Sequence, residues 1–476
     1  MKRKSGILMH ISSLCGDYSC GSFGKEAFEF IDFLKDCGYT YWQVLPFCIT
    51  DKHNSPYMSY SSVGGNINFI DLTTLYEKGL LTEDELEKQK QFTPYSCEFD
   101  RLNKERFNVL KLAASRVENK SAIYDFINKN KSIADCCLFM ALKDKNNDLP
   151  WYEWTNNTPN DETLFAWQFI QYEFHTQWDK VHRYANANGI KIIGDLPFYV
   201  AYDSCDVRNN QEQFLLDKNG RPECVAGVPP DYFSEEGQLW GNPLYNWEHM
   251  QKDGFSWWKN RLEYMLTLFD GIRIDHFRAL SEYWSVPANS KTAKSGKWMP
   301  APGKEMVEMI KTVADGKLII AENLGLIDSK VDDLLEYSGF PGMAVFQFGF
   351  DGNTSNPHLP HNYKNNLVAY TGTHDNNTLL GFIWELDNYT RQAVLDYVGF
   401  GDSDWNKCYD TILKVINMSS AGIVIMPIQD ILGYGSDTRL NTPGKTDGNW
   451  GYRVTKEQLN SIDRSKFKKL NTMYGR

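Results

Sequence analysis

Asp275 ends an apolar segment that begins at Gly271 and has the sequence Gly-Ile-Arg-Ile-Asp. Side chains alternate along a β-strand, so Arg273 and Asp275 share one face of it. The fixed positive charge of Arg273 favours the ionised form of Asp275, which a nucleophilic carboxylate requires. Taken alone, the segment is equally consistent with an ion pair whose only role is to stabilise the strand.

Glu322 ends a second apolar segment, Leu318 to Ala321, with no cation next to it in the sequence. Apolar surroundings disfavour the charged form of a carboxyl group and raise its pKa. A glutamic acid that stays protonated near neutral pH can act as a general acid. The alternative is a strand-end glutamate exposed to water.

A third carboxylate, Asp375, follows His374 after the segment Tyr370-Thr-Gly-Thr373. A His-Asp pair can bind hydroxyl groups through charge-assisted hydrogen bonds that strengthen in the transition state. The alternative is an Asx-type turn that closes the strand. Asp195, in Gly194-Asp-Leu-Pro197, either orders Arg273 or caps a turn.

These residues require elements that place them together, and the sequence predicts eight short strands. Several contain β-branched runs that are apolar on both faces, as expected for parallel strands covered on both sides. The expected strands are Gly6–His10, Tyr41–Phe47, Lys191–Phe198, Gly271–Phe277, Leu318–Asn323, Ala344–Phe348, Leu367–Asp375 and Gly422–Asp430.

Helical patterns separate the strands. They are clearest over Lys25–Cys37, Phe165–Ala187 and Glu305–Ala314, each followed closely by a glycine. Strand–helix alternation indicates parallel βαβ units, and eight strands in 476 residues favour a closed (β/α)₈ TIM barrel. Asp275, Glu322 and Asp375 then lie on the rim formed by the carboxyl ends of the strands, where enzymes with this fold bind their substrates and carry out catalysis.

Two intervals are too long for simple crossovers. We expect one catalytic barrel domain over 1–476, with an inserted, mainly helical subdomain at 48–160 and an inserted substrate-binding loop region at 199–255. The first contains helical patterns at Thr82–Gln91 and Asn103–Val117, and the second is rich in Gly, Pro and aromatic residues. Both emerge on the rim that carries the carboxylates.

Composition excludes several classes of partner. A formal net charge of −11 argues against nucleic-acid binding, which depends on clustered Lys and Arg. The apolar run at Ile7–Met9 is too short for a signal peptide or a membrane span. The ten cysteines form no CxxC pair, which indicates reduced thiols in a cytoplasmic protein. Aromatic residues make up 14% of the chain, which fits both a large core and sugar binding.

Two carboxyl groups that flank a sugar at roughly 5–5.5 Å define a retaining glycosidase mechanism. The sequence also resembles the amylomaltases, which are 4-alpha-glucanotransferases of glycoside hydrolase family 77 in the alpha-amylase clan. The resemblance spans nearly the whole chain and is most specific in the segment Ala226-Gly-Val-Pro-Pro-Asp-Tyr-Phe-Ser234 and in Gly237-Gln-Leu-Trp-Gly-Asn-Pro-Leu-Tyr245. It is also carried by Asn54-Ser-Pro-Tyr57, Asn441-Thr-Pro-Gly444 and Gly448-Asn-Trp450.

The resemblance implies that Asp275 is the nucleophile, Glu322 the general acid/base and Asp375 the stabiliser of the transition state. It also implies a group of residues that bind the substrate or support the loop over it. These are Tyr57, Asp195, Tyr232, Phe233, Trp240, Asn242, Arg273, His276 and His374.

By the same resemblance, the expected partners are α-1,4-glucans and maltooligosaccharides, with no cofactor and no metal ion. The segment Cys48–His53 and Arg208 depart from the family pattern and affect the expected acceptor preference. The carboxylates alone do not separate a transferase from an amylase-like hydrolase, because both form the same intermediate. A transferase must limit water at the site, and the loop Gly227–Tyr245 could serve as a cover over the acceptor. A third interpretation is a glucan-binding protein without activity, which the three intact carboxylates disfavour.

Overall fold

Eight parallel strands form the centre of the molecule. A computed structural model describes residues 1–230, 235–445 and 447–476, and its main sheet has the order β10-β11-β12-β1-β2-β3-β6-β9. The backbone N–H of Ala321 in β9 donates to the carbonyl of Pro341 just before β10, at 2.9 Å, which brings the two edges of the sheet together. The strands are β1 Lys4–Leu8, β2 Tyr41–Gln43, β3 Lys191–Leu196, β6 Gly271–Ile274, β9 Leu318–Ala321, β10 Gly342–Val345, β11 Leu367–Tyr370 and β12 Ile423–Pro427.

The expected TIM barrel and all eight of its strands are confirmed. The strands are shorter than expected at their carboxyl ends, so that β11, for example, ends at Tyr370 and leaves Thr371 to Asp375 in the loop that follows. Asp275, Glu322 and Asp375 therefore lie just beyond the ends of β6, β9 and β11. The backbone N–H groups of Asp275 and Glu322 still donate to Leu196 in β3 and Ile274 in β6, so the neighbouring strands position them.

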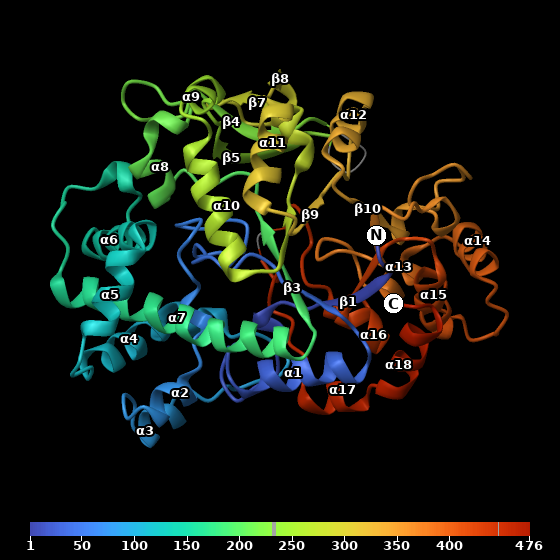
Figure 1. The fold of residues 1–476 in the computed structure, drawn as a ribbon, viewed down its shortest axis with the longest axis horizontal. Coiled ribbons are helices and arrows are strands. Elements are labelled where there is room, and N and C mark those ends of the chain that lie inside the picture. Colours follow the sequence, from blue (N-terminus) through green and yellow to red (C-terminus); the bar gives the residue numbers. More distant parts are fainter. Residues whose placement is uncertain (231–234, 446) are drawn as a thin grey trace.

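Helices cover the outside of the barrel (Figure 1). Helices α1, α7 and α11 confirm the three expected ones, and α1 packs Ala27, Phe30 and Leu34 into the core. The outer helices are α1 Lys25–Asp36, α7 Asp161–Ala187, α10 Ser256–Leu268, α11 Gly303–Ala314, α12 Ser329–Ser338, α13 Leu379–Glu385, α14 Asn388–Val398, α15 Cys408–Met418, α16 Ile428–Leu432, α17 Lys456–Ser461 and α18 Arg464–Met473.

One crossover differs from a regular barrel. The connection from β10 to β11 has no α-helix and contains only two 3₁₀ turns, Phe346–Phe348 and Pro360–Asn362. The segment contains two prolines and several Gly and Asn residues, which oppose a continuous helix because proline lacks a backbone donor and glycine is conformationally free.

The long segment between β2 and α7 is mainly helical. It packs against α7, and its buried residues, such as Phe139 and Leu110, belong to the same continuous apolar core as Ile272 of the barrel. Its helices are α2 Leu72–Glu77, α3 Glu83–Glu87, α4 Phe99–Ser115, α5 Ser121–Lys129 and α6 Lys131–Lys145. Within the described ranges, no helix is both long enough and apolar enough to cross a membrane.

A second sheet stands beside the barrel rim, and the sequence did not predict it. Its order is β5-β4-β7-β8, all antiparallel. Strands β4 (Cys224–Val228) and β5 (Gln238–Pro243) belong to the expected loop region, which also contains the short helices α8 (Cys205–Asn209) and α9 (Trp247–Lys252). Strand β4 pairs with β7 (Glu282–Pro287), which pairs in turn with β8 (Lys297–Pro300); β7 and β8 belong to a third insertion that follows β6.

Gly194 in β3 offers a test of how tightly the barrel wall is packed. A Cβ at this position would lie 2.2 Å from Cδ2 of Phe269. We expect Gly194→Ala to lower the free energy of unfolding by about 1–3 kcal/mol, because the ring must move within a close-packed wall. Urea unfolding followed by far-UV circular dichroism measures the change.

Gly401→Ala is the matched control, since an added Cβ there meets no atom within 4 Å. Equal stability of the two variants would contradict the packing argument.

Candidate active site

Arg273 lies between two carboxylates at the rim. Its Nη1 donates to both oxygens of Asp195, at 2.8 and 2.9 Å, and its Nη2 lies 3.0 Å from Oδ1 of Asp275. Burial alone would lower the pKa of Arg273, but Asp195 and Asp275 raise it well above its usual value. Arg273 is therefore a permanent positive charge beside Asp275, whose side chain is 28% exposed and accessible to a ligand.

Asp195 is fully buried. Besides its contact with Arg273, its Oδ2 accepts a hydrogen bond of 2.7 Å from the hydroxyl of Tyr57. Of the two roles considered for Asp195, the structure shows the ordering of Arg273. Because no part of Asp195 is exposed, it acts through Arg273 and Tyr57 and does not itself face a ligand.

Glu322 follows β9 directly, and backbone donors hold its carboxyl group. Oε2 accepts from the backbone N–H of His276 at 2.7 Å, and Oε1 accepts from that of Leu324 at 2.8 Å. His276 has a left-handed backbone conformation, with φ of 52°, which turns the chain sharply after Asp275. Burial raises the pKa of Glu322 to about 7, with Arg273 opposing the shift and Asp275 adding to it.

Asp375 has the opposite protonation preference. Its Oδ2 lies 3.2 Å from Nε2 of His374, and its Oδ1 accepts a 2.6 Å hydrogen bond from Nδ2 of Asn441. Burial tends to raise the pKa of Asp375, but His374, Asn441 and Arg273 outweigh it and lower the pKa to about 2. Asp375 is ionised at neutral pH, and 46% of its side chain is exposed.

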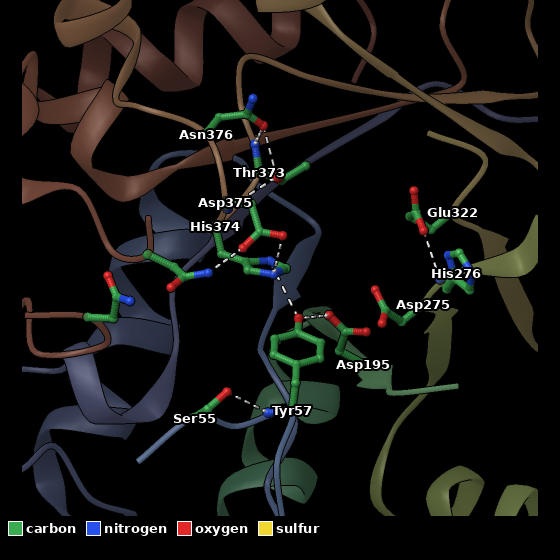
Figure 2. A network of polar contacts seen from close by, with 12 residues as sticks. Ser55, Tyr57, Asp195, Asp275, His276, Glu322, Thr373, His374, Asp375 and Asn376 are labelled. Carbon is green, nitrogen blue, oxygen red and sulfur yellow. Dashed lines mark hydrogen bonds and ion pairs between the residues drawn. The ribbon is translucent and has the colours of Figure 1, made fainter. Parts of the chain in front are cut away.

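Tyr57 connects the two halves of the site. Its ring stacks on that of His374, with centroids 5.0 Å apart and 18° between the planes, and its hydroxyl lies 3.5 Å from Nδ1 of His374. Figure 2 shows Asp275, Glu322 and Asp375 in one region, on either side of Tyr57 and Asp195. The three carboxylates, which come from three different strands, therefore belong to one site.

The remaining expected residues differ in position. Trp240 in β5 places its ring 5.0 Å from that of His276, edge to face. Asn242 is buried, and its Nδ2 donates to the carbonyl of Val200 at 2.9 Å, so that it fastens β5 to the loop after β3. Tyr232 and Phe233 lie outside the described residues.

His276 lies in the turn that follows β6, next to Asp275. Burial lowers the pKa of His276 to about 4, so its ring is neutral at pH 7. Its Nε2 is buried and has no hydrogen-bond partner within the described part of the chain. Across the same part of the chain, no group of three or more His, Cys, Asp and Glu side chains could hold a metal ion.

The C-terminal segment supplies further contacts to the site that the sequence patterns did not predict. Arg439 donates through Nη2 to the backbone carbonyl of Asp375 at 2.6 Å, and through Nε to that of Asn441 at 2.7 Å. The ring of Trp450 lies 5.9 Å from those of Tyr57 and His374. The motif around Asn441 was visible in the sequence, but nothing local to it indicated a contact with Asp375.

Comparison with known proteins agrees with this geometry. Residues 9–459 match the model of glycoside hydrolase family 77, described as 4-alpha-glucanotransferase. The chain belongs to this family. A 4-alpha-glucanotransferase of Synechocystis is 41% identical over 100% of this chain and 98% of its own length. That of Clostridium butyricum is 40% identical over 98% and 100%, respectively.

A solved structure matches over its full length as well. The amylomaltase from Streptococcus agalactiae in complex with acarbose has a TM-score of 0.96 and 36% identity, with 100% of both chains covered. The activity is therefore that of a 4-alpha-glucanotransferase, which answers the choice between transferase, hydrolase and inactive binding protein that the residues alone left open.

Asn441 offers a test of how the enzyme holds Asp375. Asn441→Ala removes the hydrogen bond to Oδ1, and bonds to charged groups contribute about 1.5–3 kcal/mol. We expect kcat/KM for glucan transfer to fall roughly tenfold to a hundredfold, measured by the initial rate of glucose release from maltotriose.

Asn449→Ala is the matched control. Asn449 bonds the backbone of the same loop at Thr442 and Lys445 but does not contact Asp375. An equal loss of activity in both variants would mean that loop order matters and the contact with Asp375 does not.

Proposed function

We propose that the enzyme transfers glucan segments by a retaining double displacement on Asp275, Glu322 and Asp375. The observation that supports this most directly is the contrast between two neighbouring carboxyl groups. Glu322 has a pKa of about 7 and can give up or take a proton at neutral pH, whereas Asp275 has the guanidinium of Arg273 3.0 Å from its Oδ1 and a side chain that is 28% exposed to a ligand. This is the division of roles that retaining glycosidases require.

In the first step, Glu322 gives its proton to the glycosidic oxygen while a carboxylate oxygen of Asp275 attacks the anomeric carbon. The bond to the leaving glucan breaks, and an ester between Asp275 and the donor segment forms. In the second step, the ionised Glu322 takes the proton of an acceptor 4-OH, whose oxygen attacks the same carbon and releases Asp275. Two inversions leave the α-configuration unchanged.

Asp375 supports the positively charged transition state from the other side of the ring. Its ionised carboxylate is held by His374 and Asn441, so it is ordered before the substrate arrives, as electrostatic stabilisation requires. Arg273, His276 and His374 are placed to bind hydroxyl groups of the same sugar. Tyr57 and Trp240 offer aromatic faces beside it.

We infer that the substrates are α-1,4-glucans and maltooligosaccharides. The relative from Streptococcus agalactiae, similar over its full length, was solved in complex with acarbose. The rings of Tyr57, His374 and Trp450 form a group beside Asp375 that suits the apolar faces of glucose units.

We also propose that 199–255, which includes Tyr232 and Phe233, forms the substrate-binding loop region. We further propose that 48–160 is a helical subdomain of the single domain 1–476. The placement of Trp240 against His276 supports the first assignment. A cytoplasmic location is supported by the ten cysteines, all unpaired, because disulfides are rare in that compartment.

Disproportionation of maltotriose tests the transfer reaction. We expect glucose and a ladder of longer oligomers, with the total number of reducing ends nearly constant, because each cut is followed by transfer to a 4-OH. Chromatography of the products, together with a reducing-end assay, measures both quantities. A steady increase in reducing ends would show that water is the main acceptor.

Reaction with azide, with α-maltosyl fluoride as the donor, distinguishes the nucleophile from the general acid/base. Glu322→Ala should give an α-glycosyl azide, since azide attacks the ester on Asp275. Asp275→Ala should give a β-glycosyl azide by direct attack. Exchange of the two outcomes would reverse the assignment.

The pKa of Glu322 predicts the pH dependence of the first step. Because that pKa is raised to about 7 and the acid must be protonated, we expect kcat/KM to fall as pH rises through about 7. The fall should approach tenfold per pH unit. Initial rates with maltotriose between about pH 5 and 9 measure it.

Glu322→Gln is the control for the pH profile. Its residual activity, expected to be lower by about 10²–10⁴-fold, should show no fall near pH 7. An unchanged profile in this variant would assign the titration to another group.

A further inference from the structure

Two cysteines from distant parts of the sequence meet next to the active-site rim. Sγ of Cys20, in the loop between β1 and α1, lies 3.9 Å from Sγ of Cys97, just before α4. Sγ of Cys97 also lies 3.3 Å from the carbonyl of Ser12. A disulfide needs about 2.05 Å between sulfurs, so rotation of the two side chains could bring them into bonding distance.

Two buried arginines accompany this pair. Arg106 and Arg453 are 2% and 1% exposed. Within the described residues, Nε of Arg106 and Nη2 of Arg453 have no hydrogen-bond partner. The interaction with Cys97 lowers the pKa of Cys20 against the effect of burial, and the two guanidinium charges lower it further.

The partner thiol behaves in the opposite way. Burial raises the pKa of Cys97 well above its usual value, and Cys20 raises it further. The pKa is thus lowered at Cys20 and raised at Cys97, so Cys20 is the more easily deprotonated of the two thiols. Redox-sensitive cysteine pairs need this combination of an attacking thiolate and a resolving thiol.

A cavity of about 850 Å³ reaches the pair from one side. Its lining includes Cys20, with Tyr18, Glu26, Thr74 and Val454 around it. Cys97 does not line the cavity. A small oxidant that enters would therefore reach Cys20, which is 3% exposed, before Cys97; Cys15 also lines the cavity, but burial raises its pKa to about 11.

We propose that Cys20 and Cys97 form a peroxide-sensitive thiol pair that closes into a disulfide. The thiolate of Cys20 attacks hydrogen peroxide, the O–O bond breaks, and a sulfenic acid and hydroxide form. Cys97 then attacks the sulfenic sulfur. The S–O bond breaks, the oxygen leaves as water with the thiol proton of Cys97 and the sulfenic proton, and the S–S bond forms. The two thiols lose two electrons, and the peroxide is reduced.

The disulfide would fix a junction that supports the active site. The backbone N–H of Cys97 donates to the carbonyl of Gly451 at 2.7 Å, and the preceding residue, Trp450, packs beside Tyr57 and His374. The link would close 77 residues of chain between Cys20 and Cys97. The oxidised enzyme would therefore resist unfolding of the rim.

The experiment treats the reduced, full-length enzyme with hydrogen peroxide, alkylates the remaining thiols and maps the peptides by mass spectrometry. We expect a linked pair of peptides containing Cys20 and Cys97, two hydrogens lighter than the reduced pair and reversed by dithiothreitol. The melting temperature should rise by an amount on the order of 4 °C. Complete alkylation of both cysteines after peroxide, or oxidation of the more exposed Cys224 before Cys20, would overturn the proposal.

Two variants locate the attacking sulfur. In Cys97→Ser, which keeps a donor for the carbonyl of Ser12, dimedone should label Cys20 as the trapped sulfenic acid. Cys20→Ser should lose this label. Cys205 is the internal control, because its hydrogen bond with Cys136 and its burial raise its pKa well above the usual value. Labelling of Cys97 or Cys205 in place of Cys20 would also overturn the proposal.

Discussion

The buried guanidinium of Arg273 is the interaction on which the rest of the site depends. A buried charge without partners costs several kcal/mol, so this arginine is stable at the rim only with Asp195 and Asp275 beside it. Strand register supplies the first partner, since Asp195 in β3 lies directly opposite Arg273 in β6. The second follows from the chain itself, because Asp275 comes two residues after Arg273. The register of β3 against β6 therefore also determines whether the charge of Arg273 is neutralised.

This charge acts differently on the carboxyl groups around it. Asp275 and Asp195 contact Arg273, whereas Glu322 is held by two backbone donors and its pKa is governed by burial. Asp375 has a different partner, His374, whose ring stacks on Tyr57; the hydroxyl of Tyr57 in turn donates to Asp195. One continuous network thus holds Asp375 ionised and leaves Glu322 able to exchange a proton near neutral pH. The difference arises from local contacts, because both side chains carry the same carboxyl group.

Sequence patterns were sufficient for the barrel and for the placement of Asp275, Glu322 and Asp375 at the carboxyl ends of its strands. Buried parallel strands are short, β-branched runs, such as Ile423-Val424-Ile425, and this signal is local. The second sheet was missed because β4 pairs with β7, which belongs to the separate insertion that follows β6. The hydrophobic periodicity of a single segment does not indicate which distant strand it pairs with. The role of Asn441 was missed for the same reason, since its contact with Asp375 spans 66 residues.

Contacts between residues far apart in the sequence also meet at the rim. Tyr57 and His374 are 317 residues apart, and Arg453, near the C-terminus, donates to the carbonyls of Leu14 and Tyr18. Closing such distances costs chain entropy before any contact is gained, so these contacts form only once the barrel has brought its strand ends together. The segment from Arg439 to Arg453 then fixes Asp375 on one side and the junction of Cys20 and Cys97 on the other. The C-terminal segment is thus a structural part of the active site, and a change in it reaches the carboxylates through backbone and side-chain contacts without altering any strand.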